Sequence, residues 1–446
     1  MASDDRRSAR LAGVVAFSSF FVFPAIPVGN TAALTVPFML TLGLVALWLP
    51  RLRTAEWWPY AAVMGPVAIS ACFCLMLGTA LAPAIAPKAL VATGVAFLSV
   101  IPARRLLRDG HGDAFVTGAA YAILVHAAIG AYQVFAFERG EFPFAGTMRT
   151  NPAMALLTED IPTYVAYVKR PFGLFAEPSA MAACIGPWLV VLAHALFAPR
   201  RERPARRTAL LALALAGGSA LVVASKSGLA APIVLGTAIT AFAAALSGRR
   251  GFGTRGAALL MGVAIAVASA AWLTEHAGSR FELARNDSWQ ARLGSLELGV
   301  QSLAASTDSA RDFLVGVGPG QSYAAVNSTV LKYKVDAGVT AVWSIGLGHA
   351  METGLLGILG MIALAAAAAV SIWTSRARVA GAACAVVWLA GALIGTSLFG
   401  QPALWTGLAA LLSWRSLTEP APRRAGAPRA RELDRGRSAA ELVVPT

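Results

Sequence analysis

The sequence predicts an all-α polytopic membrane protein with about twelve transmembrane helices and two long outer loops. Of its 446 residues, 57% are hydrophobic and only 13% are charged, and the mean hydropathy is +0.64. An average soluble domain carries about 25% charged residues, so this composition excludes an ordinary soluble protein. Apolar stretches of about 20 residues, the length that crosses the hydrocarbon core of a bilayer, recur along the whole chain.

Twelve stretches meet this criterion, with boundaries defined to within about two to four residues. They lie near residues 10–28, 31–49, 58–79, 84–102, 114–136, 177–198, 208–224, 228–247, 256–273, 353–373, 379–397 and 402–416. The first stretch is predicted to be a span rather than a cleaved signal peptide, because no small-residue cleavage site follows it and the second span begins almost at once.

Arginines decide the predicted orientation of these spans. They follow the second, fourth, sixth, eighth and tenth spans, precede the first and follow the last, and these positions hold 25 of the 37 basic residues. Connections rich in Arg and Lys remain on the cytoplasmic side of a membrane. The alternation therefore predicts that both termini are cytoplasmic, and it explains most of the net charge of +14 without a nucleic-acid partner.

The membrane domain is predicted to occupy residues 1–416. Residues 417–446 are rich in Pro, Arg and Ala, which predicts a basic, disordered cytoplasmic tail attracted to anionic headgroups. The four cysteines all fall inside apolar spans and are expected to be small buried hydrophobic residues rather than disulfide partners. They are Cys72, Cys74, Cys184 and Cys384.

The remaining twelve basic residues lie on the predicted outer, periplasmic side, against the positive-inside tendency. Most of them belong to two long connections, about residues 138–176 and 274–350, and connections longer than about 15 residues are usually functional. Two such loops are expected to cover one outward-facing cavity. The twelve residues are Lys88, Arg139, Arg149, Lys169, Arg170, Lys226, Arg280, Arg285, Arg292, Arg311, Lys332 and Lys334.

The segment Arg170-Pro171-Phe172-Gly173-Leu174-Phe175-Ala176-Glu177-Pro178-Ser179 places a cation and a carboxylate at the beginning of the sixth span. A charge near lipid is costly unless it faces a wet cavity or a charged ligand, so Arg170 and Glu177 are predicted to belong to a site. Two simpler roles stay open. Arg170 is alternatively an interface anchor, and Glu177 is alternatively a carboxylate that caps the helix ahead of Pro178.

Two further cations are candidate ligands for an anion. Lys226, in Ser225-Lys226-Ser227-Gly228, occupies the turn between two spans, either as a solvated loop residue or as a cation beside free backbone N–H groups. Arg292 lies one turn into a predicted amphipathic helix over the bilayer, where it contacts either lipid headgroups or substrate. Asp287 or Ser288 is expected to cap that helix. Its apolar positions are Leu293, Leu296, Leu298 and Val300.

Two features precede the tenth span. The run Gly316-Val317-Gly318-Pro319-Gly320 lacks the complete pattern of a phosphate-binding loop, so it predicts a glycine turn that lets two helices approach. His349 and Glu352, spaced i, i+3, share a helix face and are a candidate base or base-orienting pair. The other histidines do not pair with a second ligand at metal spacing, and the sequence predicts no metal site.

In this order, the motifs resemble the bacterial O-antigen ligase and Wzy-type polysaccharide polymerase superfamily over roughly residues 80–375. Each motif alone is weak, and their joint order is more specific. The motifs are Arg-Pro-x-Gly-x-x-x-Glu-Pro-Ser at 170–179, Ser-Lys-Ser-Gly at 225–228, Ser288-x-x-x-Arg292, Gly316-x-Gly-x-Gly and Glu352-Thr353-Gly354-Leu355-Leu356-Gly357.

The resemblance implies an enzyme of the bacterial inner (plasma) membrane whose active site faces the periplasm and which uses neither a metal nor another cofactor. It implies an undecaprenyl-pyrophosphate-linked oligosaccharide as donor, a glycan as acceptor, and a chain-length regulator as a further candidate partner. Arg170, Lys226, Arg292 and, as an additional candidate, Lys88 match the family's basic cradle for the pyrophosphate.

The chain departs from the family pattern at two positions. Many members have Arg where this chain has Lys226, and a lysine lacks the bidentate fork that arginine offers to phosphate. Members of the ligase branch carry a histidine about nine residues before the Glu352 run, where this chain has Trp343-Ser344. His349, two turns later, is a candidate substitute for that histidine, but the departure favours a polymerase-branch protein that does not use it.

The expected reaction is an inverting glycosyl transfer in which a hydroxyl attacks C1 of the donor while pyrophosphate leaves from the opposite face. Fixed cations stabilise the departing charge, and the proximity of two tethered substrates supplies much of the rest. Glu177, Glu352 or His349 is the candidate acceptor of the hydroxyl proton. The favoured activity is polymerisation of repeat units of O-antigen, capsule or exopolysaccharide. The alternatives are an O-antigen ligase that acts on lipid A core or another acceptor and, from another class, a lipid-linked oligosaccharide flippase or solute transporter.

Overall fold

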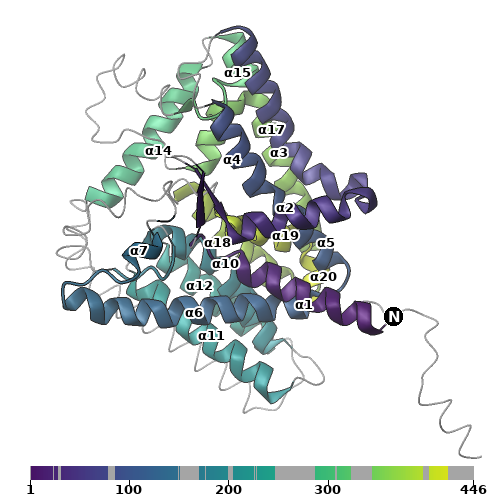
Figure 1. The fold of residues 1–446 in the computed structure, drawn as a ribbon, viewed down its shortest axis with the longest axis vertical. Coiled ribbons are helices and arrows are strands. Elements are labelled where there is room, and N and C mark those ends of the chain that lie inside the picture. Colours follow the sequence, from purple (N-terminus) through teal and green to yellow (C-terminus); the bar gives the residue numbers. More distant parts are fainter. Residues whose placement is uncertain are drawn as a thin grey trace, which may run out of the picture.

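The computed structural model describes residues 2–23, 25–28, 32–78, 86–148, 150, 170–175, 177–198, 204–225, 227, 229–246, 287–306, 309–322, 344–394 and 401–419. This part of the chain is mostly helical (Figure 1). Within these ranges, five helices are long and apolar enough to cross a membrane, which agrees with an all-α membrane protein. They are α3 (Thr54–Met76), α6 (Gly112–Glu138), α10 (Pro178–Phe197), α11 (Ala205–Ala224) and α17 (Ile345–Trp373).

Four more apolar helices in the described part of the chain are shorter than the usual span, and the predicted ninth span lies outside it. The shorter helices are α2 (Val36–Trp48, continued by the 3-10 helix η1, Leu49–Arg51), α12 (Ala230–Leu246), α18 (Arg378–Ile394) and α19 (Pro402–Leu412). Smaller elements are α7 (Ala145–Met148), α14 (Asp287–Ser306), α15 (Ala310–Val315) and α20 (Trp414–Thr418). Within the described ranges, the structure therefore shows fewer full-length spans than the twelve predicted.

The first two predicted spans are wrong at the place where they meet. Helix α1 (Ala2–Ser18) ends early, and strands β1 (Ala25–Val28) and β2 (Ala32–Thr35) form an antiparallel hairpin with Val28 opposite Ala32. The sequence contains the cause, because Pro24, Pro27 and the Gly29-Asn30 pair disfavour a helix and favour a chain reversal.

The fourth predicted span is divided into α4 (Ala86–Leu98) and α5 (Val100–Arg108). Pro102 explains the break, because its ring clashes with the carbonyl group four residues earlier and it cannot donate a backbone hydrogen bond. That carbonyl belongs to Leu98, the last residue of α4.

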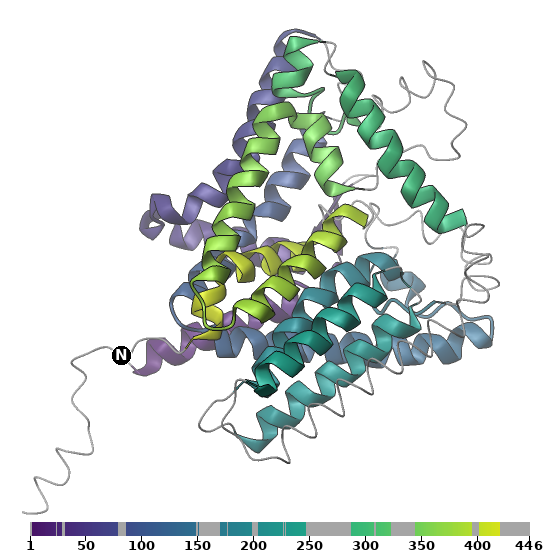
Figure 2. The same ribbon diagram turned by 180° about the vertical axis from the view of Figure 1, so that it is seen from behind.

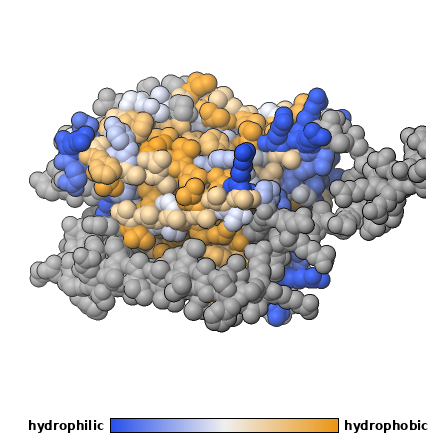
Figure 3. Space-filling model, turned by 90° about the horizontal axis from the view of Figure 1, so that it is seen from below, coloured by the Kyte–Doolittle hydropathy of each residue, from blue (hydrophilic) through white to orange (hydrophobic). Residues whose placement is uncertain are grey.

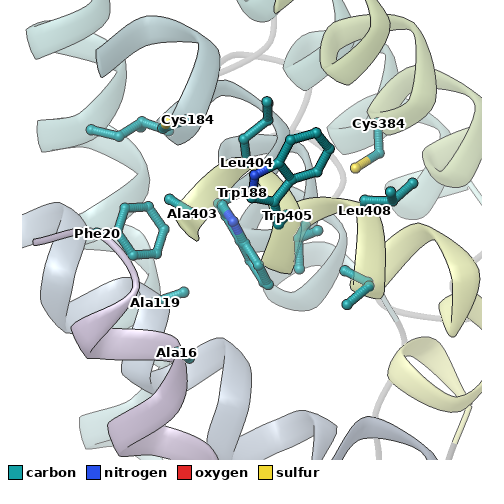
Figure 4. Packing of buried hydrophobic residues seen from close by; sticks show 14 of the residues in the cluster. Ala16, Phe20, Ala119, Cys184, Trp188, Cys384, Ala403, Leu404, Trp405 and Leu408 are labelled. Atoms are coloured by element: carbon teal, nitrogen blue, oxygen red, sulfur yellow. The ribbon is translucent and has the colours of Figure 1, made fainter. Parts of the chain in front are cut away.

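Helix α10 lies at the centre of the molecule and contacts α6, α11, α12, α18 and α19. Its side chains are buried along nearly its whole length. In Figure 4, Trp188 of this helix lies between Phe20, which follows α1, and Leu404 and Trp405 of α19. The rings of Trp188 and Phe20 are 6.2 Å apart. Tight aromatic packing of this kind fixes how the helices around α10 are arranged.

The arginine-rich helix ends that the structure describes meet at one end of the molecule, which we call the basic end; the connection after residue 246 lies outside the described residues. It comprises the described helix ends around residues 48–58, 104–113, 205–207, 371–378 and 413–419. Arg104 donates to the carbonyl of Ala55 at 2.9 Å, and Arg207 pairs with Asp113 at 2.9 Å. These contacts place connections that are far apart in the sequence side by side, as the alternation of arginines predicts.

Interactions at the basic end use both charge and aromatic surface. The Arg105 guanidinium lies 4.9 Å from the ring centroid of Trp48 and 3.8 Å from the Glu56 carboxylate. Burial and the neighbouring Arg108 lower the pKa of Arg104 to about 10, while Glu56 acts in the opposite direction. Arg104 therefore stays cationic at neutral pH. Glu419 accepts hydrogen bonds from the backbone of Arg376 and the side chain of Arg415.

The outer surface of the bundle is apolar. Seen from below, the molecule presents an apolar belt with hydrophilic ends on two opposite sides (Figure 3). Large apolar residues on the surface of α6 and α11 include Tyr121, Phe135 and Leu213, of which Phe135 is 68% exposed. Such a belt suits a lipid environment and not water.

The cysteine prediction holds for three residues of the four. Cys74, Cys184 and Cys384 are buried, whereas Cys72 is exposed, and all four are free. Cys72 lies on the outer surface of α3 beside the exposed residues Ile69 and Phe73, so an apolar span does not bury every residue type that it contains.

Candidate functional site

The motifs that carry the family resemblance lie far from the basic end. Helix α6 begins at the basic end and reaches Gln133 after about 31 Å, at 1.5 Å per residue. The second part of α17 covers a similar length between Trp373 at the basic end and Glu352. The described contacts of the motif residues form two groups. One surrounds the turn at residues 170–175, and the other surrounds the glycine turn at residues 316–320.

The turn at residues 170–175 is bound to the buried side chain of Gln133. The Gln133 Oε1 atom accepts hydrogen bonds from the backbone N–H groups of Phe172 at 2.9 Å and Gly173 at 2.8 Å. Its Nε2 atom donates to the carbonyl of Gly173 at 2.8 Å. One amide side chain therefore satisfies three backbone groups that would otherwise be buried without partners.

His126, about two turns before Gln133 on α6, binds the next residue of the turn. Its Nδ1 atom accepts a hydrogen bond from the backbone N–H of Leu174 at 3.1 Å. The ring is fully buried, with centroids 4.9 Å from Phe21 and 4.5 Å from Phe175. Gly173 has φ of +63°, and a Cβ atom there would lie 2.6 Å from His126 Nδ1. Only glycine fits at this position.

Neither His126 nor Gln133 is among the site residues predicted from the sequence. The spacing of seven residues places both on the same side of α6, and a buried Gln and His in an apolar span are costly without partners. These two residues could therefore have been recognised in the sequence, because a polar residue in the middle of a span usually has a binding partner. Their partners, however, are 39 to 48 residues away in the sequence.

Glu177 occupies the N-cap position of α10, with Pro178 as the first helical residue. The carbonyl of Glu177 accepts the hydrogen bond of Met181 N–H at 3.0 Å. Its side chain does not cap the helix, because its Oε1 atom accepts a short hydrogen bond from the Ser179 hydroxyl instead. Glu177 therefore occupies the N-cap position, but its carboxylate binds Ser179 and not the backbone of the first turn. Arg170, partly buried, precedes the turn that Gln133 holds.

The glycine turn is bound by Glu352. The Ser322 hydroxyl donates to Glu352 Oε1 at 2.7 Å, and the backbone N–H groups of Gly320 and Ser322 also bind this carboxylate. The Glu352 carbonyl accepts from Gly318 N–H at 3.1 Å and from the Ser70 hydroxyl at 2.6 Å. Among the described residues, Glu352 thus binds the glycine turn and α3, and not His349 as the i, i+3 spacing predicts.

Two backbones approach each other closely at the glycine turn. A Cβ atom at Gly316 would lie 2.4 Å from the Glu352 carbonyl carbon, and one at Gly354 would lie 2.6 Å from the Gly316 nitrogen. Gly354 has φ of +61° and kinks α17. The prediction of a glycine turn that lets two helices approach is confirmed for α15 and α17.

The His349 ring lies beside Gly357 of α17, whereas the Glu352 carboxylate binds Ser322. It is 3% exposed, and its Nε2 atom would lie 3.2 Å from a Cβ atom at Gly357. Thr353 donates a short hydrogen bond to the His349 carbonyl. At the position of the ligase histidine, the Ser344 hydroxyl accepts from Leu347 N–H at 3.3 Å and caps α17.

Of the four predicted cradle cations, the structure describes the side chain of Arg170 alone. Lys226 lies outside the described residues, and Lys88 and Arg292 lie in α4 and α14 with side chains that are not described. The serines beside Lys226 are buried, and Ser227 Oγ accepts from Leu229 N–H at 3.3 Å near the beginning of α12. Whether the four cations converge is therefore still a prediction.

Helix α14 exists where the sequence predicts an amphipathic helix, but its buried face differs. Leu298 is buried as expected, and its buried neighbours are the polar Ser295 and Ser302, one turn to either side. Val300, which the pattern places on the apolar side, is 56% exposed. The helix contacts α17 and runs from the neighbourhood of α15 toward the side of α7 in both ribbon views (Figures 1 and 2).

Neither a metal site nor a known relative gives this chain a function directly. Within the described ranges, no group of three or more His, Cys, Asp or Glu side chains is placed to hold a metal ion. No model of a known protein family matches the chain, and no curated protein sequence matches it.

Proposed function

We propose that the chain is a metal-independent inverting glycosyltransferase of the bacterial inner membrane that polymerises repeat units of an O-antigen, capsule or exopolysaccharide. One observation carries the proposal. The turn at residues 172–174 is bound by the buried side chains of Gln133 and His126, about 30 Å from the basic end. Arg170 and Glu177 flank this turn, and Glu177 begins the central helix α10.

The proposed topology has twelve spans, both termini in the cytoplasm and the segment 170–179 on the periplasmic side. The meeting of the arginine-rich connections at one end supports this orientation, because positive connections stay in the cytoplasm. An undecaprenyl-pyrophosphate donor presents its phosphates at the outer surface of the membrane, where Arg170, Arg292, Lys226 and Lys88 are proposed to bind them.

In the proposed reaction, an acceptor hydroxyl attacks C1 of the donor sugar and the C1–O bond to pyrophosphate breaks. Negative charge grows on the leaving group, and prearranged guanidinium groups stabilise it most in a site with little water. We assign Arg170 to this role. Rigid attachment of its turn to α6 reduces the reorganisation needed at the moment of reaction.

The three candidate proton acceptors have different surroundings. Glu352 binds the backbone and hydroxyl of the glycine turn, so we assign it a positioning role. His349 is almost fully buried. Glu177 is partly buried at the start of α10, with Ser179 as a hydrogen-bond partner, and we propose it as the base that accepts the hydroxyl proton.

A polymerase is favoured over a ligase at one described position. Where ligases carry their histidine, this chain has Trp343-Ser344, and the Ser344 hydroxyl is used to cap α17. The serine therefore contributes to the beginning of a helix and does not replace the missing histidine.

The test uses purified protein, a lipid-linked repeat unit and detergent without a vesicle boundary. The wild type should form polymer and release undecaprenyl pyrophosphate. Arg170→Ala should lower the rate about 100-fold or more, the usual effect of removing one charge-stabilising donor, and Arg170→Lys should restore part of it. Arg139→Ala is the matched control, since Arg139 is an exposed arginine at the other end of the same outer connection, and should retain wild-type activity.

Three outcomes would contradict the proposal. Equal activity of Arg170→Ala and the wild type would remove Arg170 from the site. Donor consumption that requires a lipid A core acceptor would identify a ligase. Movement of intact donor across a vesicle membrane, with no product in detergent, would identify a transporter.

A further inference from the structure

We propose that the groove between α1 and α6 binds one anionic phospholipid of the inner leaflet, with its headgroup on Arg10 and one acyl chain along the groove. The groove has a volume of about 820 Å³ and lies on the surface of the bundle. This site is separate from the turns at residues 170–175 and 316–320, and the inference does not depend on the proposed enzymatic activity.

Two glycines form the floor of the groove. A Cβ atom at Gly118 would lie 2.1 Å from the carbonyl oxygen of Gly13, so α1 and α6 cross there with backbone against backbone. Because neither glycine has a side chain, the crossing leaves a depression between the neighbouring side chains. Val14 and Phe17 of α1 and Tyr121 and Val125 of α6 line its sides.

The side walls of the groove are apolar and face outward. Val14 is 51% exposed and Tyr121 is 53% exposed, which is expected of side chains in contact with lipid and not with water. Along α6 the groove extends from Asp113 to Val125, about 18 Å at 1.5 Å per residue. One leaflet of the hydrocarbon core is about 15 Å thick, so the groove has the length of one acyl chain in one leaflet.

The charged residues that line the polar end of the groove carry a net positive charge. Arg10, Asp113 and Arg207 line it, and Arg207 pairs with Asp113 at 2.9 Å. Among the described residues Arg10 has no ion pair, and it is exposed. One uncompensated cation thus lies at the basic end, at the mouth of an apolar groove.

An anionic phospholipid complements both parts of this surface. A phosphodiester headgroup at the membrane surface is attracted by about 1 kcal/mol per arginine. Its acyl chain would pack against the apolar side walls of the groove. A peptide would bring backbone N–H and C=O groups that the apolar walls cannot satisfy. The arginine-rich residues 423–437 are excluded by their charge, since Arg10 repels them.

The test compares the full-length protein with dioleoyl phosphatidylglycerol and with dioleoyl phosphatidylcholine, which has the same acyl chains and no net charge. In native mass spectrometry from detergent, the wild type should retain one phosphatidylglycerol molecule at low lipid concentration and bind phosphatidylcholine more weakly. Arg10→Gln should weaken the binding of phosphatidylglycerol about fivefold, the factor that corresponds to about 1 kcal/mol. Arg6→Gln is the matched control, because Arg6 is on the same helix but does not line the groove.

A second variant tests the acyl-chain part of the groove. Val14→Trp fills the groove from an exposed position and should reduce binding of both lipids while the protein elutes at the same size in gel filtration. Equal losses in Arg10→Gln and Arg6→Gln would overturn the proposal, since binding would then depend on general surface charge. A wild-type dimer that Val14→Trp converts to a monomer would also overturn it, because a second copy would then occupy the groove.

Discussion

At the scale of single residues, polar side chains within apolar helices hold the two turns in place. Gln133 is the clearest case, because one buried amide binds three backbone groups of Phe172 and Gly173. In lipid-facing proteins a backbone group without a partner costs several kcal/mol. The cost of burying the Gln133 amide is thus offset because it provides hydrogen-bond partners for three buried backbone groups of the turn.

Replacement of Gln133 by Leu should therefore destabilise the protein and move Arg170. Two backbone N–H groups would lose their acceptor, at about 1–3 kcal/mol each. Thermal unfolding in detergent should show a clear decrease in midpoint, and polymer formation should fall together with it. Tyr132→Phe, at the exposed neighbouring position, should leave both unchanged. Normal stability of Gln133→Leu would show that the turn does not depend on this side chain.

Glu352 and Ser322 allow a positioning role to be separated from proton transfer. Ser322→Ala removes a hydrogen bond of 2.7 Å from the carboxylate but leaves the carboxylate itself in place. If Glu352 positions the glycine turn, Ser322→Ala and Glu352→Gln should each reduce the rate by a similar, modest factor, with the same pH profile as the wild type. A loss of about 100-fold or more in Glu352→Gln, with Ser322→Ala at wild-type activity, would instead identify Glu352 as the base.

At the scale of elements, the kink in α17 connects the glycine turn to the membrane domain. Helix α17 changes direction at Gly354, where φ is +61°. A Cβ atom at Gly354 would lie 2.6 Å from the Gly316 nitrogen. The kink makes room for the turn, and the carbonyls of Met351 and Glu352 accept hydrogen bonds from Val317 and Gly318. Any side chain at Gly354 would separate the two elements.

Gly354→Ala should lower the free energy of unfolding by about 2 kcal/mol or more, because it adds both a positive-φ penalty and a backbone clash. Gly348→Ala, six residues before the kink on the same helix, is the control. A Cβ atom at Gly348 meets no other atom within 4 Å, and alanine favours helix, so this variant should be neutral or slightly more stable. Thermal unfolding of the two purified variants measures the difference. Equal stability of both would mean that the close approach at Gly354 is relaxed in solution.

At the scale of the whole molecule, the basic end fixes the direction of the bundle. Arginine-rich connections that are separated by up to about 370 residues in the sequence meet there, and their side chains bind one another's helix ends. Leu417 is buried and packs near Gly112, so the chain remains part of the folded unit beyond the predicted domain end at residue 416. The proposed orientation places this entire end in the cytoplasm.

Introduced cysteines test that orientation. In a cysteine-free background, a cysteine at Glu141 should react with a membrane-impermeant maleimide added to spheroplasts, whereas one at Asp109 should react only after the membrane is opened. Both positions are exposed, so a difference in labelling reports the side of the membrane. Labelling of the Asp109 position in intact spheroplasts would invert the proposed topology and place the segment 170–179 in the cytoplasm.

The sequence alone determined the class of the protein, the end at which the arginines meet, and the local elements at the motifs. Composition and charge alternation are summed over many residues, so they survive errors at single positions. Local chemistry also predicted the beginning of α10 at Pro178 and the glycine turn beside α17. The break at Leu98 and the hairpin at residues 25–35 were missed, although Pro102, Pro24 and Pro27 signal them.

Only the tertiary structure decided which groups hold the motifs. Gln133 and His126 are bound to residues 39 to 48 positions away, and Ser70 is bound to Glu352 across 282 positions. Periodicity carries no information about such pairs, because a hydrogen bond across the fold depends on how whole helices pack. The i, i+3 spacing of His349 and Glu352 also did not predict the partners of Glu352. Its carboxylate binds donors in the glycine turn, which is distant in the sequence, and not a residue of its own helix.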